Sequence, residues 1–279
     1  MSTNSKPVIA YSDLREWLAE AERLGEVRTV RNANWQEDIG LVAEAILRAE
    51  NGPCVVFEDV EGCPKGHRLL LNMFAGRRRN MTLGFPTELS KWELSDGYRD
   101  AFLTTQKSIP HEMVETGPVF ENIIMGDDVD VTKFPSPVWH EKDGGRYIGT
   151  GTYSITRDPE EGWLNAGAYR GQVFDEKTVG ILMAPGHHGA IHCDKYFKKG
   201  EPMPVVMVVG GDPLAFLLGG LEAPYGTFEF DMIGGMRGRA EKMVKGKITG
   251  LPIPANAEIV LEGFVHPDRR IVEGPFGEW

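Results

Sequence analysis

Near residue 117 the residue pattern changes from helical spacing to short strand-like runs. Beyond this point, short β-rich runs are separated by Gly, Pro and Asp, and one helix is expected around residues 238–244. Short strands with turn signals between them favour a sandwich or barrel over repeated βαβ units. The expected strands lie within residues 147–156, 167–173, 179–183, 205–209 and 258–265.

The preceding part has apolar residues at helical spacing. This spacing predicts a helix over residues 14–24, with Ser12 as its N-cap and Gly25 as its stop. We therefore expect an N-terminal α/β domain over residues 1–116, followed by a strand-rich domain over residues 117–279. Further helices are expected over residues 37–50 and 86–106, and strands over residues 54–57 and 69–74.

Charge and cysteine content limit the partners and the compartment. Thirty Lys and Arg against 41 Asp and Glu give a formal net charge of −11, which argues against a nucleic-acid binder. The longest apolar runs, 205–209 and 214–218, are far shorter than the ~20 residues of a membrane helix. Three cysteines without a CxxC pair, and the absence of a signal-peptide pattern, favour a reducing compartment. We expect a cytoplasmic protein that binds neither nucleic acid nor membrane.

Two acids flank a Gly/Pro-rich turn at the end of the sequence. Glu273 and Glu278 are five residues apart with Gly-Pro-Phe-Gly between them. Such a turn could direct both carboxylates into one cavity, where repulsion and desolvation would raise one pKa for acid/base work. A surface turn with two solvated acids has the same spacing, so the residues alone leave both interpretations open.

Histidines and one isolated acid are possible metal ligands. Imidazole suits transition metals, but His187 and His188 would point to opposite faces of a strand. His188 and His192 could share one face of a helix or of a strand. Glu229 lies in an apolar setting, where a buried acid needs a cation or a hydrogen-bond partner. The alternatives are structural histidines and an exposed Glu229 on an edge strand.

Other polar segments carry weaker signals. Asn165 and Arg170 lie in a β-run, where an Arg is most often a surface or salt-bridge residue. The basic run 77–79 is expected on a solvated face. The glycines at 149–151 do not form GxGxxG and open no helix, so a Rossmann site is not indicated.

Taken together, an ordered series of motifs resembles the UbiD family of decarboxylases, which use prenylated flavin mononucleotide (prFMN). The N-terminal stretch DLREWLAEAERLGEV also looks like the opening helix of that family. The resemblance spans essentially the whole sequence. The motifs, in order, are PSPVWHEKDGGRYIGTG, DPEEGWLNAGAYRGQ, PGHHGAIH, PMPVVMVVGGDP and EGPFGE.

This resemblance implies a set of site residues. Asn165, His188 and Glu229 match the family's ligands for a divalent metal, expected to be manganese, which anchors the cofactor phosphate. Potassium is a further candidate ion. Arg170, Glu273 and Glu278 match the catalytic network, with Glu278 as proton donor and the other two tuning its pKa. Cofactor contacts are implied for Thr150, Asn165, Ala168, Tyr169, Arg170, His187, His188 and Glu229.

The resemblance also implies an α+β fold and a reaction. A split β-barrel flavin-binding domain should follow the N-terminal α/β domain, and the family's C-terminal domain is missing from these 279 residues. The implied activity is reversible, non-oxidative decarboxylation of an aromatic or α,β-unsaturated acid, with prFMN as electron sink. Alternatives are a plain FMN oxidoreductase and a non-catalytic, truncated or accessory chain. The longer parent protein is expected to be a homo-oligomer, and the identity of the acid is not readable.

Overall fold

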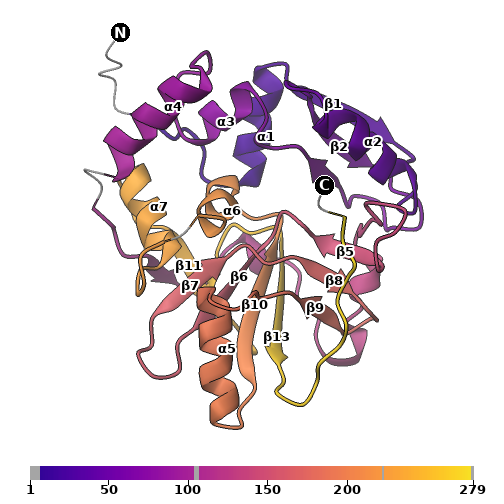
Figure 1. Ribbon diagram of the computed structural model, residues 1–279, viewed down its shortest axis with the longest axis vertical. Helices are drawn as coiled ribbons and strands as arrows, with labels where there is room; N and C mark the ends of the chain where they lie inside the picture. The colour runs from indigo at the N-terminus through magenta and orange to yellow at the C-terminus, as the bar shows by residue number, and fades with distance from the viewer. Residues whose placement is uncertain (1–6, 104–106, 222, 278–279) are drawn as a thin grey trace.

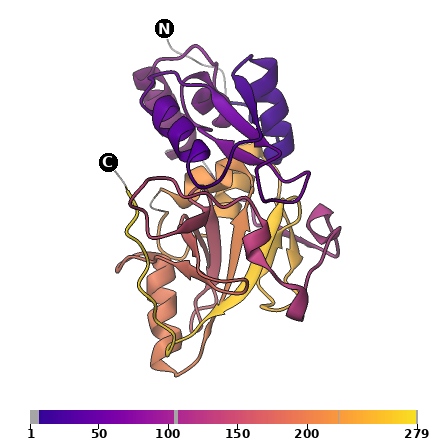
Figure 2. The same cartoon turned by 90° about the vertical axis from the view of Figure 1, so that its right-hand side faces the viewer.

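The computed structural model describes residues 7–103, 107–221 and 223–277. A helix-rich N-terminal part lies against a strand-rich part (Figures 1 and 2), so the expected mixture of helices and strands is confirmed. The strands form four sheets, and no closed barrel is present within the described ranges. None of the helices in these ranges is both long and apolar enough to cross a membrane.

A small mixed sheet lies at the centre of the N-terminal part. β1 and β2 are parallel and α2 connects them, as parallel neighbours require a crossover, whereas β3 is antiparallel to β2. The helices expected over 14–24 and 37–50 are confirmed, and η1 is a π-helix. The elements are α1 (Leu14–Arg23), β1 (Val27–Arg31), α2 (Asp38–Leu47), β2 (Cys54–Glu58), β3 (Leu69–Leu71), α3 (Arg77–Thr82), α4 (Lys91–Tyr98) and η1 (Arg99–Leu103).

The predicted N-cap of α1 is wrong by one residue. Asp13 has extended backbone angles, and its Oδ1 accepts a hydrogen bond from the Glu16 N–H at 2.9 Å. Ser12 instead donates its backbone N–H to the Glu16 carboxylate at 2.7 Å. The stop is confirmed, because Gly25 follows the helix in the left-handed region at φ +73°.

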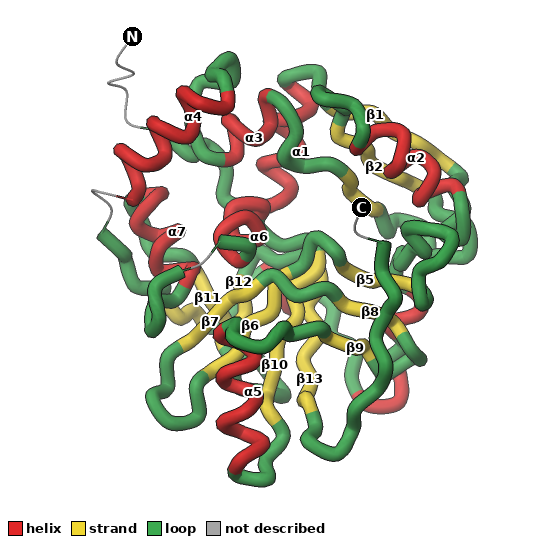
Figure 3. The backbone as a smooth tube through the Cα atoms, in the orientation of Figure 1, coloured by secondary structure: helices red, strands yellow, loops and turns green. Residues whose placement is uncertain are grey.

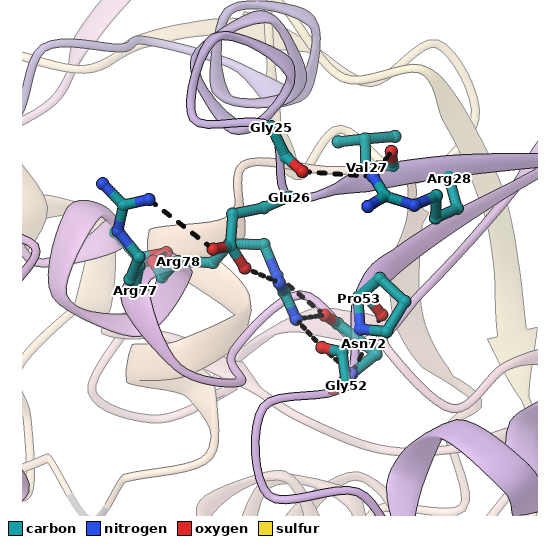
Figure 4. A network of polar contacts seen from close by, with 10 residues as sticks. Gly25, Glu26, Val27, Arg28, Gly52, Pro53, Asn72, Arg77 and Arg78 are labelled. Carbon is teal, nitrogen blue, oxygen red and sulfur yellow. Dashed lines mark hydrogen bonds and ion pairs between the residues drawn. The ribbon is translucent and has the colours of Figure 1, made fainter.

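The basic run at the start of α3 does not form a solvated face, because the side chain of Arg78 is completely buried. Its guanidinium contacts the Glu26 carboxylate at 2.5 Å and the carbonyl oxygens of Gly52 and Asn72 at 2.7 and 3.0 Å (Figure 4). One side chain thus joins the segments that follow α1, α2 and β3. Arg77 is partly exposed and lies 3.8 Å from Glu26.

The strand-rich part contains three sheets, ordered β13-β10-β6-β7, β12-β11-β4 and β5-β8-β9. The first and third sheets are antiparallel throughout. The elements are β4 (Glu112–Val114), η2 (Pro118–Phe120), η3 (Gly126–Asp128), η4 (Val131–Lys133), β5 (Arg146–Gly149), β6 (Tyr153–Arg157), β7 (Leu164–Gly167), β8 (Gly171–Val173), β9 (Val179–Ile181), α5 (His188–Lys198), β10 (Met203–Val209), α6 (Pro213–Gly219), α7 (Glu229–Arg237), β11 (Lys242–Lys245), β12 (Pro252–Pro254) and β13 (Ile259–Val265).

Two expectations for this part are wrong in detail. The run 147–156 contains two strands of different sheets, because β5 ends at Gly149 and β6 begins at Tyr153. The helix expected around 238–244 is misplaced. Gly238 adopts φ +73° and ends α7, and the residues that follow it form β11.

The two parts share a continuous apolar core. Trp17 of α1 is fully buried in the same cluster as Tyr153 and Val206 of the strand-rich part. The Trp17 indole N–H also donates to Oγ1 of Thr82 at 2.8 Å. On the other face of β10, Met207 packs in a smaller cluster with Ile148. Strand β10 is therefore buried on both faces, which positions the sheets that carry the site.

Candidate functional site

Arg170 and Glu273 form a bidentate ion pair. Nε and Nη2 of Arg170 donate to the two carboxylate oxygens of Glu273 at 2.8 and 2.9 Å. The hydroxyl of Tyr147 donates to Oε1 of the same carboxylate at 3.1 Å. Arg170 lies in the β7–β8 connection, Tyr147 on β5, and Glu273 in the segment after β13, which runs past β9, β8 and β5 (Figure 3). The sequence gives no spacing signal for Tyr147, which is 126 residues from Glu273.

This arrangement sets the ionisation states of the three groups. The Arg170 guanidinium holds the pKa of Glu273 below its usual range, and the Tyr147 hydrogen bond acts in the same direction. Burial, followed by the negative charge of Glu273, raises the pKa of Tyr147. An ionised Glu273 is therefore held between a cation and a phenol that keeps its proton.

The turn that carries Glu273 is held by the loop before β5 and by β8. The Gly144 N–H donates to the Pro275 carbonyl at 2.7 Å, and the Gly277 N–H donates to Asp143 Oδ1 at 2.8 Å. Gly274, at φ +87°, donates its N–H to Gln172 Oε1 at 2.8 Å. Glu278, the predicted proton donor, lies outside the described residues.

The ring of Phe276 completes this turn. Its centroid is 4.6 Å from that of Tyr147 and 5.0 Å from the guanidinium carbon of Arg170. Cation–π and edge-to-face contacts of this kind favour a fixed ring position. The turn therefore contributes an aromatic wall as well as a carboxylate.

Asn165 lies on β7, and His188 and Glu229 lie on α5 and α7, two helices that both contact β7. The carboxylate of Glu229 accepts the N–H of Ala166, the residue after Asn165, at 2.6 Å. The Tyr169 hydroxyl accepts the N–H of Gly189, the residue after His188, at 2.9 Å. The edge-strand alternative for Glu229 is wrong, because this residue begins α7 and is 2% exposed.

Two observations indicate that this cluster fits a divalent cation. Burial raises the pKa of Glu229 to about 7. The hydrogen bonds to this carboxylate therefore do not offset the cost of burying its negative charge, and a bound cation would. Asn165 is 2% exposed, and its Nδ2 has no hydrogen-bond partner among the described residues, although its side chain lies close enough to Tyr169 to act toward a lower pKa of that phenol. One imidazole nitrogen and two oxygen donors suit Mn²⁺. Within the described residues, no three His, Cys, Asp or Glu side chains form a metal-binding group, and this cluster contains only two such side chains, His188 and Glu229.

The other predicted cofactor contacts lie beside these two clusters. Ala168 donates its N–H to the Gly219 carbonyl at 2.8 Å, and Tyr169 is 5% exposed. His187, the N-cap residue of α5, is exposed. Thr150 is exposed in the β5–β6 turn, whose Thr152 donates to the Tyr169 carbonyl at 2.9 Å.

A cavity of about 2550 Å³ is lined by Thr150 and Glu273, but not by Arg170 or the three proposed metal ligands. Its walls include Ile148 and Met207, on the apolar face of the sheets. The cavity therefore includes only part of the candidate site, which is defined here by its side-chain contacts.

Two family models match the chain. The model of the 3-octaprenyl-4-hydroxybenzoate carboxy-lyase Rift-related domain matches residues 112–279, and the model of the N-terminal domain of the same carboxy-lyase matches residues 18–93. The chain belongs to the UbiD family. Characterised relatives of this UbiD-family chain include the pyrrole-2-carboxylic acid decarboxylase of Pseudomonas aeruginosa (30% identity, 96% of this chain, 55% of the relative). The phenolic acid decarboxylase of Bacillus subtilis is 31% identical over 97% of this chain and 58% of its own length.

Solved structures agree with this UbiD assignment. The closed form of the vanillic acid decarboxylase of Sedimentibacter hydroxybenzoicus superposes with a TM-score of 0.87 at 30% identity, covering 97% of this chain and 58% of the other. An evolved dimeric form of the UbiD-class enzyme HmfF from Pelotomaculum thermopropionicum, in complex with prFMN, gives 0.84 at 29% identity, covering 96% and 60%. The chain thus spans little more than half the length of these relatives.

Proposed function

We propose that this UbiD-family protein catalyses the reversible, non-oxidative decarboxylation of an aromatic or α,β-unsaturated carboxylic acid, with prFMN and a divalent metal ion. The bidentate Arg170–Glu273 pair beside Tyr147 is the observation that carries the proposal. The decarboxylase activities of its relatives agree with this reaction class. Bound prFMN would supply the electron sink, which no side chain can provide.

The roles of the protein groups follow from their charges. Arg170 would orient the substrate carboxylate through charge-assisted hydrogen bonds. Glu273 would hold the guanidinium in place and keep its charge partly compensated. We assign Glu278 as the acid that delivers the proton to the carbon that has lost CO2, with its pKa tuned by the Arg170–Glu273 pair.

Asn165, His188 and Glu229 would hold the divalent ion, expected to be Mn²⁺, and through it the cofactor phosphate. Thr150, Ala168, Tyr169 and His187 would contact the rest of the cofactor. Potassium remains a further candidate ion.

The domain assignment is also part of the proposal, with an α/β domain over residues 1–116 and a split β-barrel over residues 117–279. The cytoplasmic location and the homo-oligomeric parent protein remain predictions from the sequence and its resemblance.

The experiment combines native mass spectrometry with a CO2-release assay. Purified protein supplied with prFMN and Mn²⁺ should retain both and release CO2 from at least one member of a panel of cinnamic, hydroxybenzoic and pyrrole-2-carboxylic acids. Glu278→Gln should retain the cofactor and lose turnover. Bound cofactor with unmodified FMN absorbance and nicotinamide oxidation would point to an oxidoreductase. Cofactor retention without turnover on the whole panel would point to a non-catalytic chain.

A further inference from the structure

Four aromatic rings from three segments meet at the proposed metal site. Trp163 precedes β7, His188 and His192 lie one turn apart on α5, and Tyr225 lies between α6 and α7. The Trp163 ring centroid is 5.1 Å from that of His188, 4.5 Å from that of His192 and 4.9 Å from that of Tyr225. Trp163 is the only one of the four that contacts all the others.

His188 has an unusual environment for a metal-binding histidine. A ligating imidazole normally donates its second ring N–H to a carboxylate, carbonyl or water, which fixes the ring orientation. Among the described residues, none forms a hydrogen bond with either ring nitrogen of His188. The His188 ring instead contacts two nearly perpendicular rings, Trp163 at 87° and Tyr225 at 84° with a centroid distance of 5.9 Å.

Trp163 is itself firmly held. Its indole packs at 76° against His192, which is completely buried and whose Nδ1 lies 2.9 Å from Oγ1 of Thr156 on β6. On its other side, Tyr225 is anchored by a hydrogen bond from its hydroxyl to Glu161 at 2.9 Å. Nε1 of Trp163 is buried without a hydrogen-bond partner in the described part of the chain, so packing rather than hydrogen bonding positions this ring.

We infer that Trp163 is a positioning residue that sets the orientation of the His188 ring for metal binding, in the role that a hydrogen-bonded acceptor usually has. This inference rests on the proposed metal site. Perpendicular ring pairs are a favoured aromatic geometry, and each such pair contributes beyond simple area burial. His192 and Tyr225 support Trp163, and His192 is not a metal ligand in this arrangement.

The test measures Mn²⁺ binding to the protein loaded with prFMN by the EPR signal of free Mn²⁺, and nitrogen coupling to bound Mn²⁺ by pulsed EPR. Trp163→Leu should weaken Mn²⁺ binding by about tenfold or more and reduce the nitrogen coupling. Trp163→Phe, which retains a ring, should recover most of the affinity. Trp139→Leu is the matched control, because Trp139 is also half-buried with a buried, unpartnered Nε1, but packs in a separate cluster.

The outcomes separate this inference from the proposed function. If Glu229→Gln abolishes Mn²⁺ binding while Trp163→Leu leaves affinity and nitrogen coupling unchanged, the positioning role is wrong and the metal site stands. If the wild-type protein loaded with prFMN binds no Mn²⁺, the proposed metal site and this inference are both wrong, whereas CO2 release by the same protein would leave the proposed reaction standing. Should Trp163→Leu fail to fold, Tyr225→Leu decides, because Tyr225 is 54% exposed and its loss should still reduce the nitrogen coupling. An unchanged coupling in that variant would overturn the inference.

Discussion

The hydroxyl of Tyr147 and the guanidinium of Arg170 share one carboxylate oxygen, Oε1 of Glu273, at 3.1 and 2.8 Å. Glu273 therefore has two donors that stabilise its ionised form, one charged and one neutral. Arg170 is the larger influence on the pKa of Glu273, and Tyr147 adds to it. The neutral donor can be removed without altering the net charge of the site.

Tyr147→Phe should raise the pKa of Glu273, because the carboxylate loses a hydrogen bond that favours its ionised form. The acidic limb of kcat/KM, which falls as Glu273 becomes protonated, should then move to higher pH. The measurement is the pH–rate profile of the loaded enzyme, with Tyr98→Phe as control, since Tyr98 is a partly buried tyrosine packed in the main core. Coincident acidic limbs for wild type and Tyr147→Phe would contradict this role.

Gly144→Ala should lower kcat by about tenfold or more, because a small displacement of a catalytic group is costly. A Cβ at this position would collide with the carbonyl oxygen of Gly274 and push the turn away from Arg170. Gly263→Ala is the control, since a Cβ there meets no atom within 4 Å. Steady-state kinetics and thermal unfolding of both variants check the prediction, which fails if Gly144→Ala keeps wild-type kcat.

Arg78→Leu should destabilise the fold by about 3–5 kcal/mol, because it leaves the Glu26 carboxylate without its buried partner. It also removes the donor to the carbonyls of Gly52 and Asn72. Arg77→Leu should cost about 1 kcal/mol or less, since that side chain is 41% exposed and its ion pairs are solvated. Urea unfolding at pH 7 compares the two, and equal losses of stability would refute the special role of Arg78.

Mn²⁺ at 100 times its dissociation constant should stabilise the wild-type protein by about 2.7 kcal/mol. Glu229→Gln and Asn165→Ala should lose most of this gain, because each removes one of three proposed donors. Thermal unfolding with Mn²⁺ and after chelation provides the measurement, and Mg²⁺ tests selectivity. An equal gain in wild type and Glu229→Gln would place the ion elsewhere.

The sequence does not predict the two helices that carry His188 and Glu229. The helices α5 and α7 lack start signals, because their N-cap residues are His187 and Phe228, and neither side chain forms a cap hydrogen bond. The sequence therefore leaves His188 open between a helix and a strand, and an edge strand stays possible for Glu229. The motif series nevertheless proposes both as site residues, since a motif records residue identity without regard to local propensity.

The contacts between residues far apart in the chain could not be predicted from the sequence pattern. No periodicity links Arg170 with Glu273, which are 103 residues apart, and the support from Tyr147 emerges only in three dimensions. The burial of Arg78 was missed for a similar reason, because its partners lie on loops 26 and 52 residues away in sequence. Local pattern predicts amphipathic helices such as α1 well, but it does not predict which charged side chain the loops enclose.

The ion pair between Arg170 and Glu273 can form only after both residues have been synthesised, which places it late in the folding of this region. A chain emerging from the ribosome can pair β5 with β8 and complete the hairpin of β6 and β7 long before residue 273 is made. Strand β13 pairs with β10, and the turn over residues 273–277 follows β13 in the chain. Glu273 can therefore contact Arg170 only after β13 has been synthesised. The Arg170–Glu273 pair therefore joins strands that can already have paired, and it is not needed to bring those strands together.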